Sequence, residues 1–389
     1  MKHLLFAEDR DICLHKFEDS HQFNGAIVPP TYSNTLFIYP SFEKLADANS
    51  HKHDHYVYSR GMNPTVDLVE KKLAALERGE QCKTFSSGMA AITAAVFNSI
   101  KGGDHVLVVS NIYSTTLKLL KYLQKFHVEH SVVYSTDLQE IEQAIRPNTT
   151  LMYLESPTDL YLRLIDLKAL ANLAKTKSIR TIIDNTWATP LFQKPLTLGI
   201  DIVVHSASKY LGGHSDVMAG AIIASKSIIE TIFSEEYLLH GAILVPDEAT
   251  KLLKGLRTLP LRMKVHEENA YKVAAFLEGH EQVKSVHYPG LPTHPDYELS
   301  QKQMYGYSGL LTFEIYSSAF ERVAQVINRV KVFQIGVSWG SFESLISAPN
   351  YGTNLESLRQ EHINPGLIRL IVGQGDAGEL IEDLDQALR

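Results

Sequence analysis

Hydrophobic positions recur regularly along the chain only from about residue 61 onward. Between residues 61 and 225, short apolar or β-branched runs alternate with longer amphipathic segments. The strands predicted from these runs are His105–Ser110, Val128–Tyr134, Thr150–Leu154, Thr181–Asp184, Ile202–His205 and Ala219–Ala224. Such alternation predicts an α/β fold with a mostly parallel sheet, helices on both faces, and ligands at the carboxyl ends of the strands.

The pattern differs on both sides of this region. Residues 1–60 show little periodicity and predict an extended arm that packs on another surface. Asp247–Leu277 predicts one long or kinked helix, interrupted near Pro260. The last strands and helices are predicted at Leu310–Tyr316, Ala319–Arg329, Leu367–Val372 and Glu379–Leu388. We therefore predict an arm (1–60), a large domain (61–255) and a smaller α+β C-terminal domain (256–389).

Composition narrows the class of protein. A chain of 389 residues with 44% hydrophobic and 21% charged residues is typical of a globular protein with two domains. A net charge of −7 without basic clusters disfavours nucleic acid and membrane partners. Cys13 and Cys82 are too few for a disulfide framework, and no signal peptide or run of about 18 apolar residues occurs. We expect a cytoplasmic protein.

The strongest candidate for chemistry is Lys209, which follows the predicted strand ending at His205. Ser206 and Ser208 offer hydroxyls to phosphate oxygens, two glycines follow the lysine, and the amine is suited to form an imine with an aldehyde. A lysine that caps a loop explains this segment slightly better when the segment is taken alone.

Asp184 strengthens this interpretation. It ends the apolar run Thr181–Asp184, where a buried carboxylate needs a cationic partner. A protonated pyridine nitrogen is such a partner, and a carboxylate beside it keeps the ring an electron sink. An N-cap or a salt-bridged aspartate is the competing explanation.

Two further segments fit a flat, phosphorylated cofactor. Gly88 and Met89 open the helical run that ends near Asn98, and a helix N-terminus attracts phosphate through free N–H groups. Tyr113 follows the strand ending at Ser110 and is suited to stack on a ring. Each feature is also common in proteins that bind no cofactor.

Residues outside the large domain complete the candidate site. Tyr58 and Arg60 end the arm and offer a phenol and a guanidinium for phosphate, which suggests that they come from a neighbouring subunit. Arg369, on the strand Leu367–Val372, suits the α-carboxylate of an amino acid, although a surface ion pair is the commoner fate of an arginine.

Two other patterns imitate binding motifs. Gly373 to Gly378 fits GxGxxG, but the chain ends too soon for the acidic residue expected ~20 positions later, so we predict a tight turn. His51, His53 and His55 alternate, yet a solvated linker is the better interpretation because metal ligands need an ordered second shell. We predict no metal site.

Taken together, these residues resemble the Cys/Met-metabolism family of pyridoxal-phosphate (PLP) enzymes. The resemblance runs from about residue 56 to the C-terminus and is most specific from Ile183 to Asp216. It implies the aspartate aminotransferase-like fold (fold type I) and a homotetramer whose paired subunits share active sites. The roles it implies are a Schiff base at Lys209, the ring nitrogen at Asp184, stacking by Tyr113, phosphate contacts from Gly88, Met89, Ser206, Ser208, Tyr58 and Arg60, and substrate carboxylate binding by Arg369.

The resemblance also implies a carbon–sulfur lyase acting on a sulfur-containing amino acid. Lys209 would remove the α-proton, with Tyr113 or Tyr58 as proton relay. Val337, Ser338 and Trp339 resemble a substrate-binding segment of bacterial cystathionine β-lyases.

Two positions depart from the subgroups of the family. An apolar residue at Val337 is more similar to methionine γ-lyase, and Asp159 replaces the usual asparagine. β-Elimination, γ-elimination, γ-replacement by a transferase, and PLP binding without catalysis therefore stay open.

Overall fold

The large domain contains one seven-stranded sheet. Six of its strands were predicted from the sequence, and the seventh, β1, is an edge strand that the sequence pattern did not reveal. The computed structural model describes residues 2–389. The strands of this sheet are β1 (Gln81–Phe85), β2 (His105–Val109), β3 (Glu129–Val133), β4 (Thr149–Glu155), β5 (Arg180–Asp184), β6 (Ile202–His205) and β7 (Gly220–Ala224).

The order and direction of the strands bring the loops that follow the parallel strands to the same end of the sheet. The order is β1-β7-β6-β5-β4-β2-β3, and only β7 runs antiparallel to its neighbours. The connection from β3 crosses back over β2 to β4, so the direction of winding reverses between β2 and β4. Crevices at such a reversal are the usual ligand sites of open α/β sheets. The prediction of a mostly parallel sheet is confirmed.

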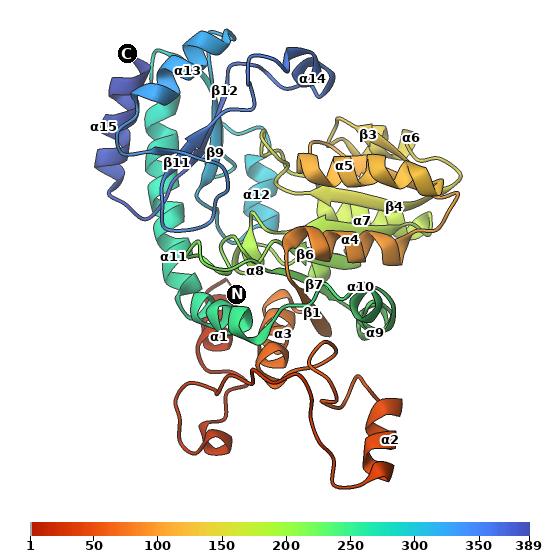
Figure 1. Ribbon diagram of the computed structural model, residues 1–389. Coiled ribbons are helices and arrows are strands. Elements are labelled where there is room, and N and C mark those ends of the chain that lie inside the picture. Colours follow the sequence, from red (N-terminus) through yellow and green to blue (C-terminus); the bar gives the residue numbers. More distant parts are fainter. Residues whose placement is uncertain (1) are drawn as a thin grey trace.

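Helices cover both faces of the sheet (Figure 1). One face packs against α4, α5 and α9 through a core that includes Ala91, Leu120 and Ile232. The other face packs against α6 and α7, and near β1 and β7 against α1, α3 and the first half of α11. The bounds are α1 (Lys2–Leu14), α3 (Pro64–Glu77), α4 (Gly88–Ser99), α5 (Ser114–Leu123), α6 (Leu138–Gln143), α7 (Leu167–Thr176), α8 (Thr189–Phe192), α9 (Lys226–Ile232), α10 (Leu238–His240) and α11 (Pro246–Glu278).

The C-terminal domain is the smaller α+β unit that the sequence predicts. Its five-stranded sheet has the order β10-β11-β12-β9-β8 and is antiparallel except for the β10–β11 pair. Its elements are β8 (Val283–His287), α12 (Tyr297–Gln303), β9 (Leu310–Ile315), α13 (Phe320–Arg329), β10 (Gln334–Ile335), β11 (Leu345–Ser347), α14 (Leu355–Gln360), β12 (Leu367–Ile371) and α15 (Ala377–Leu388). Single turns of 3-10 or π helix are η1 (Ser20–Phe23), η2 (Gln124–Phe126), η3 (Pro195–Leu198) and η4 (Phe233–Tyr237).

One helix joins the two domains. In Figure 1, α11 runs along one side of the molecule from α1 to α15. Its first half buries Leu252 and Leu256 in the core of the large domain, and its second half buries Val273 and Leu277 in that of the C-terminal domain. The predicted interruption near Pro260 is wrong, because the helix continues through this proline.

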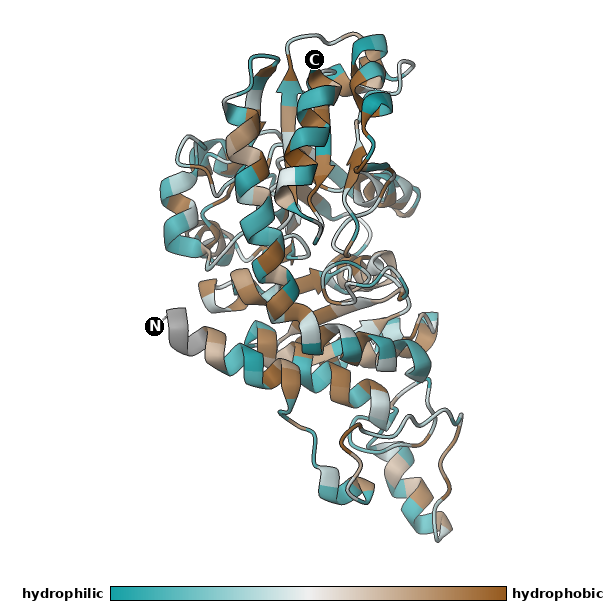
Figure 2. Cartoon of the chain, turned by 90° about the vertical axis from the view of Figure 1, so that its left-hand side faces the viewer, coloured by the Kyte–Doolittle hydropathy of each residue, from teal (hydrophilic) through white to brown (hydrophobic). Residues whose placement is uncertain are grey.

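The N-terminal segment differs from the extended arm that we predicted. Residues 2–14 form α1, which packs on α3 and α11, and a second helix, α2, spans Phe42–Ser50. The sequence of α1 has a weak amphipathic pattern, and within residues 6–14 the buried residues are Asp9, Ile12 and Cys13. The rest of the segment extends away from the body, and Figure 2 shows hydrophobic stretches along it.

The glycine-rich segment from Gly373 and the histidines from His51 make ordinary structural contacts. Gly373 to Asp376 forms the short connection between β12 and α15. The rings of His51 and His53 face different partners, Asp47 and Phe233 respectively. From residue 2 to the C-terminus, no helix combines the length and the apolar character needed to cross a bilayer.

Candidate active site

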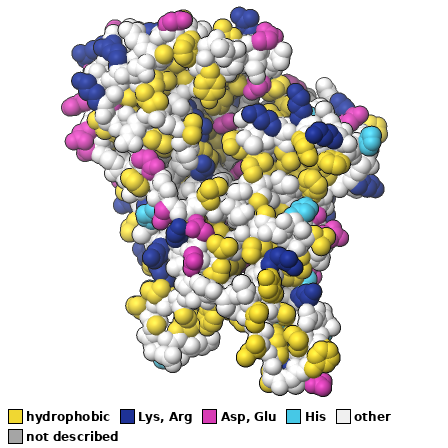
Figure 3. Space-filling model, in the orientation of Figure 1, with side chains coloured by type: hydrophobic (Ala, Val, Ile, Leu, Met, Phe, Trp, Pro, Cys, Tyr) yellow, Lys and Arg dark blue, Asp and Glu magenta, His cyan; other side chains and the backbone are white. Residues whose placement is uncertain are grey.

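The carboxyl ends of β2, β4, β5 and β6 bring the predicted residues of the large domain to one edge of the sheet. Tyr113 follows β2, Asp159 follows β4, Asp184 ends β5, and Lys209 follows β6. β1 runs in the same direction as β6, so Gly88 at the start of α4 reaches this edge too. Figure 3 shows a hollow between the two domains, with acidic and basic side chains around it.

Lys209 lies in the turn after β6, against the C-terminal domain. Its Nζ donates a hydrogen bond to the Oγ of Ser338 at 2.6 Å and lies 5.7 Å from the centre of the Trp339 ring. Burial and the positive charge of Arg369 lower the pKa of this amine to about 8, although Asp184 opposes the change. A substantial fraction of the amine is therefore unprotonated near neutral pH, as a nucleophile or base requires.

Asp184 is held by the turn that follows β5. Its Oδ1 accepts hydrogen bonds from the backbone N–H of Thr186 at 3.0 Å and from the hydroxyl of the same residue. Burial raises the pKa of Asp184, while Thr186, His205 and Lys209 favour its charged form. These interactions offset part of the cost of burying a charged carboxylate. Among the described residues, Asp184 has no ion pair within 4.0 Å.

A narrow cradle lies between the start of α4 and the turn after β6. A Cβ atom on Gly88 would lie only 2.7 Å from both the Cβ and the Oγ of Ser206, so only glycine fits there. The first N–H groups of α4, at Gly88 and Met89, have no carbonyl partner within the helix. The hydroxyl of Ser208, in contrast, already bonds to the backbone of Ala219. Gly88, Met89 and Ser206 together therefore form an anion cradle.

Tyr113 is positioned by an acidic residue that sequence analysis did not single out. Its backbone N–H donates to the Oε1 of Glu155 at 2.7 Å, and its side chain is half exposed. Burial and the charges of Asp184 and Asp159 raise the pKa of Glu155 well above its usual value. Glu155 ends β4 as Asp184 ends β5, and this shared position at a strand end is the signal that could have revealed it.

Arg369 reaches the site from the C-terminal domain. It occupies β12, where its Cα pairs with Thr312 on β9 and Ser347 on β11. Its Nε is buried and has no hydrogen-bond partner within the described chain. A buried guanidinium nitrogen without an acceptor favours binding of an anion.

The loop after β10 carries the predicted substrate segment. Ser338 has a left-handed backbone (φ 83°), and Gly340 (φ 88°) packs so closely on Lys209 that a Cβ would lie 3.0 Å from the lysine Cα. Val337 leaves 80% of its surface exposed, whereas the ring of Trp339 packs against Tyr210. The loop therefore touches the lysine and presents an apolar side chain to solvent.

Two predicted residues do not join this group within one chain. The guanidinium of Arg60 lies 5.7 Å from the ring centre of Tyr58, and the arginine approaches Gly241 rather than Lys209. Tyr58 is half exposed at the base of the arm. Their predicted phosphate contacts would have to be made in a neighbouring subunit.

A second layer of polar residues lies behind the site and was not predicted. Glu77 at the end of α3 is fully buried and bonds to Asn185 and His205, the residues next to Asp184 and Ser206. In sequence, Glu77 is one of several acidic residues in an amphipathic helix. No local pattern distinguishes a glutamate that turns inward.

Comparison with known proteins agrees with this geometry. Residues 11–389 match the family described as Cys/Met metabolism PLP-dependent enzyme. The chain is 39% identical to a protein of Fusobacterium nucleatum named L-methionine gamma-lyase over 94% of both chains. It is also 40% identical to the Bacillus subtilis cystathionine gamma-lyase, over 97% of this chain and 98% of that one. A Mycobacterium leprae cystathionine gamma-synthase is 37% identical over 94% and 92% of the two chains.

These comparisons confirm three of the predictions. The cofactor is PLP, the fold is that of fold type I, and the prediction of a PLP-dependent lyase of sulfur-containing amino acids is confirmed at the level of the family and its named relatives. The chain belongs to the Cys/Met metabolism PLP-dependent enzyme family.

Proposed function

We propose that this protein cleaves a carbon–sulfur bond in an amino acid and that Lys209 carries its PLP. The observation that carries the proposal is the setting of Lys209 between an acidic and a basic side chain. Asp184 and Arg369 both act on the charge of Lys209 although they come from different domains. The amine of Lys209 suits the aldehyde of PLP, and the carboxylate of Asp184 suits its ring nitrogen. The guanidinium of Arg369 suits the carboxylate of an amino-acid substrate.

The residues present fit PLP. The cradle of Gly88, Met89 and Ser206 suits the phosphate, because glycine is required there sterically and the helix N-terminus attracts anions. The raised pKa of Asp184 indicates a carboxyl group in need of a cation, which a protonated ring nitrogen supplies. Tyr113, half exposed at the same edge, is available to stack on the ring.

When bound, PLP supplies a conjugated ring that takes up the electron pair left on the substrate Cα after proton removal. The chain has three tasks around that ring. Arg369 binds the α-carboxylate and so fixes the orientation of the substrate. Asp184 holds a proton on the ring nitrogen. The Nζ of Lys209 would remove the α-proton of the substrate, and the Oγ of Ser338, 2.6 Å away, would orient that nitrogen.

A second proton must reach the leaving sulfur. We propose the Tyr113 hydroxyl as its source, with Tyr58 of a neighbouring subunit as the alternative relay. For a thioether such as methionine, elimination with water gives methanethiol, 2-oxobutyrate and ammonia, so atoms and charges balance. Loss of sulfur from Cβ gives pyruvate instead of 2-oxobutyrate.

We propose γ-elimination from an amino acid with a short apolar side chain. Val337 is 80% exposed and precedes Ser338, which accepts a hydrogen bond from Lys209; Ile335 at the end of β10 and Phe342 in the loop after it are also exposed. An apolar mouth favours a methyl thioether over the charged distal end of cystathionine. The names of several relatives, L-methionine gamma-lyase, support this choice.

Product analysis tests the proposed function. The purified protein with PLP is incubated with L-methionine and, separately, with cystathionine. Methanethiol and 2-oxobutyrate from methionine support the proposal, and Lys209→Ala should abolish both. Pyruvate and homocysteine from cystathionine would indicate β-elimination. Turnover only with an O-acyl homoserine and a thiol would indicate γ-replacement, and bound yellow PLP without any turnover would indicate a non-catalytic protein.

We further propose an oligomer in which paired subunits share active sites, as in a homotetramer built of dimers. The arm exposes large apolar side chains at Ile27, Ile38 and Phe42, with exposed fractions of 82%, 92% and 78%. Apolar surface of this kind is normally covered by another chain. Mixing Lys209→Ala with Arg60→Ala subunits should restore activity, because a mixed pair contains one intact site. The two free, buried cysteines fit the proposed cytoplasmic location.

A further inference from the structure

Glu77 links two strand ends that carry the proposed cofactor residues. It is 0% exposed, and its Oε1 accepts a hydrogen bond from Asn185 Nδ2 at 2.7 Å and lies 2.6 Å from His205 Nε2. Asn185 and His205 are themselves 1% and 2% exposed. One buried carboxylate on α3 thus connects the end of β5 with the end of β6.

Both partners of Glu77 are direct neighbours of functional residues. Asn185 follows Asp184 in the chain, and His205 precedes Ser206 of the phosphate cradle. A second contact connects the two strand ends: the Thr186 hydroxyl accepts a hydrogen bond from the backbone N–H of Ser206 at 2.8 Å. A shift of Glu77 would therefore move Asp184 and the cradle together.

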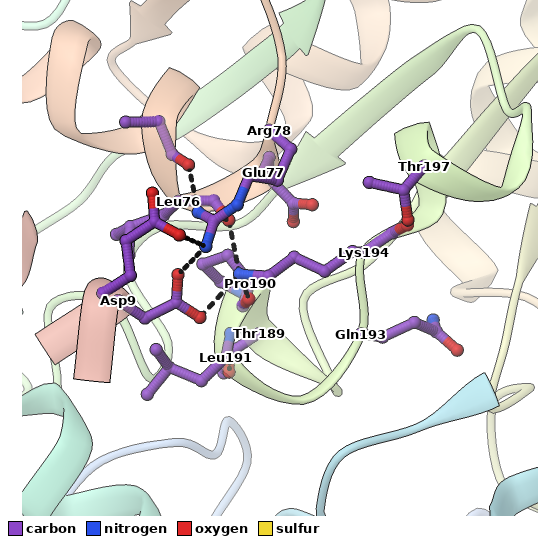
Figure 4. A network of polar contacts seen from close by, with 12 residues as sticks. Asp9, Leu76, Glu77, Arg78, Thr189, Pro190, Leu191, Gln193, Lys194 and Thr197 are labelled. Atoms are coloured by element: carbon purple, nitrogen blue, oxygen red, sulfur yellow. Dashed lines mark hydrogen bonds and ion pairs between the residues drawn. The ribbon is translucent and has the colours of Figure 1, made fainter. Parts of the chain in front are cut away.

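Among the described residues, no lysine or arginine makes a direct ion pair with the carboxylate of Glu77. Removal of a carboxylate from water is unfavourable without a paired cation. Lys194 is nearby, but its ammonium bonds to Asp9 at 2.8 Å and to the carbonyls of Leu76 and Pro190. Figure 4 shows these contacts, none of which includes the Glu77 carboxylate.

Arg78, which follows Glu77 in the chain, also binds other carboxylates. Arg78 pairs with Asp9 at 2.8 Å and with Glu8 at 3.0 Å. Asp9 thus binds both Arg78 and Lys194, and Glu8 also lies 3.9 Å from Lys16. The imidazole of His205, whose Nε2 lies 2.6 Å from Oε1, is the basic group in direct contact with the Glu77 carboxylate among the described residues.

We propose that Glu77 is a positioning residue that keeps a positive charge on His205 and thereby holds Asp184 ionised and aligned for the PLP ring nitrogen. His205 and Lys209 are the charges that oppose the effect of burial on the pKa of Asp184. Once Lys209 is bound covalently, His205 is the remaining cation of this pair. The inference rests on the proposed role of Asp184, although not on the identity of the substrate.

Glu77→Gln tests the role of the charge. Glutamine has the same shape and still accepts a hydrogen bond from Asn185, but it no longer favours protonation of His205. We expect PLP to bind about tenfold more weakly to the apoprotein, because loss of positive charge near Asp184 raises the pKa of its carboxyl group further. The visible absorbance of the bound cofactor should also change with pH at a different midpoint. Glu77→Asp, which keeps the charge, should restore part of the affinity.

Asp9→Asn is the matched control. Asp9 is as deeply buried and belongs to the same group of charges, but it contacts neither Asn185 nor His205. Both substitutions should lower the melting temperature, whereas only Glu77→Gln should alter PLP affinity and absorbance. In a His205→Gln background, Glu77→Gln should have no further effect on affinity, because the charge it acts through is gone.

Unchanged PLP affinity and absorbance in Glu77→Gln would overturn the inference. Equal losses of affinity in Glu77→Gln and Asp9→Asn would also overturn it, because they would indicate general loosening of the fold. These outcomes are distinct from failure of the proposed function, which would appear as absence of C–S cleavage in the unaltered protein.

Discussion

The reactivity of Lys209 toward PLP should depend on pH in a way that Arg369 controls. Attachment of the aldehyde requires the unprotonated amine. With a pKa of about 8, set by burial and by Arg369, ~10% of the amine is unprotonated at pH 7, compared with ~0.04% for an ordinary lysine. The structure therefore favours the reactive form ~250-fold.

This dependence can be measured by reconstitution of the apoprotein. The rate at which the visible absorbance of bound PLP appears should rise with pH and level off above about 8. Arg369→Leu removes the positive charge that disfavours protonation, so the midpoint should move upward. It should stay below the ordinary value of about 10.4, because burial of Lys209 remains.

Each unit by which the midpoint rises should slow reconstitution at pH 7 about tenfold. Arg359→Leu is a suitable control, because the Arg359 side chain is 74% exposed and pairs with the equally exposed Glu356. It should leave the midpoint near 8. A midpoint in Arg369→Leu that stays at about 8 or moves downward would refute the coupling between Arg369 and Lys209.

Three further predictions concern other parts of the molecule. Asp9→Ala removes the carboxylate that pairs with the ammonium of Lys194, whose side chain is 97% buried. The free energy of unfolding should fall by about 3–5 kcal/mol in urea titrations. Asp47→Ala, at an exposed position, should have almost no effect. Gly88→Ala places a Cβ 2.7 Å from a serine of the cradle and should weaken PLP binding at least tenfold by fluorescence titration, whereas Gly102→Ala, with 3.4 Å of space, should not. Asp159→Asn removes a negative charge that, like the charge of Arg369, acts on Glu155; if Arg369 binds the substrate carboxylate as proposed, the KM for the amino acid should fall severalfold, and an unchanged or higher KM would contradict this reasoning.

The sequence predicted the large domain well because its signals are local. Each predicted strand from His105 to Ala224 matches an observed strand within one or two residues, since buried parallel strands are continuous apolar runs. β1 was missed because Gln81–Phe85 is mixed in polarity, and its Lys83 is neutralised by Glu70 only in the folded protein. The predicted domain boundary at residue 255 lies within α11 and stays a prediction.

The candidate site shows the same limit. Lys209, Asp184 and Gly88 were predictable because each follows a strand or opens a helix at the ligand-binding edge. The roles of Glu155 and Glu77 depend on which way a side chain points after distant elements pack, and no pattern of neighbouring residues records this direction. In the proposed oligomer, Tyr58 and Arg60 would contact a second chain, and a single subunit cannot show those contacts.

The length of α11 has a consequence for how this chain tolerates insertion and deletion. Near its middle, Arg262 donates to the carbonyl of Tyr210, beside the lysine, and His266 bonds to the carbonyl of Val372, at the end of the strand that carries Arg369. Loss of one residue between these contacts would turn everything beyond it by about 100° and shift it by about 1.5 Å. Recombination between relatives should therefore succeed at this helix only where its residue count is preserved.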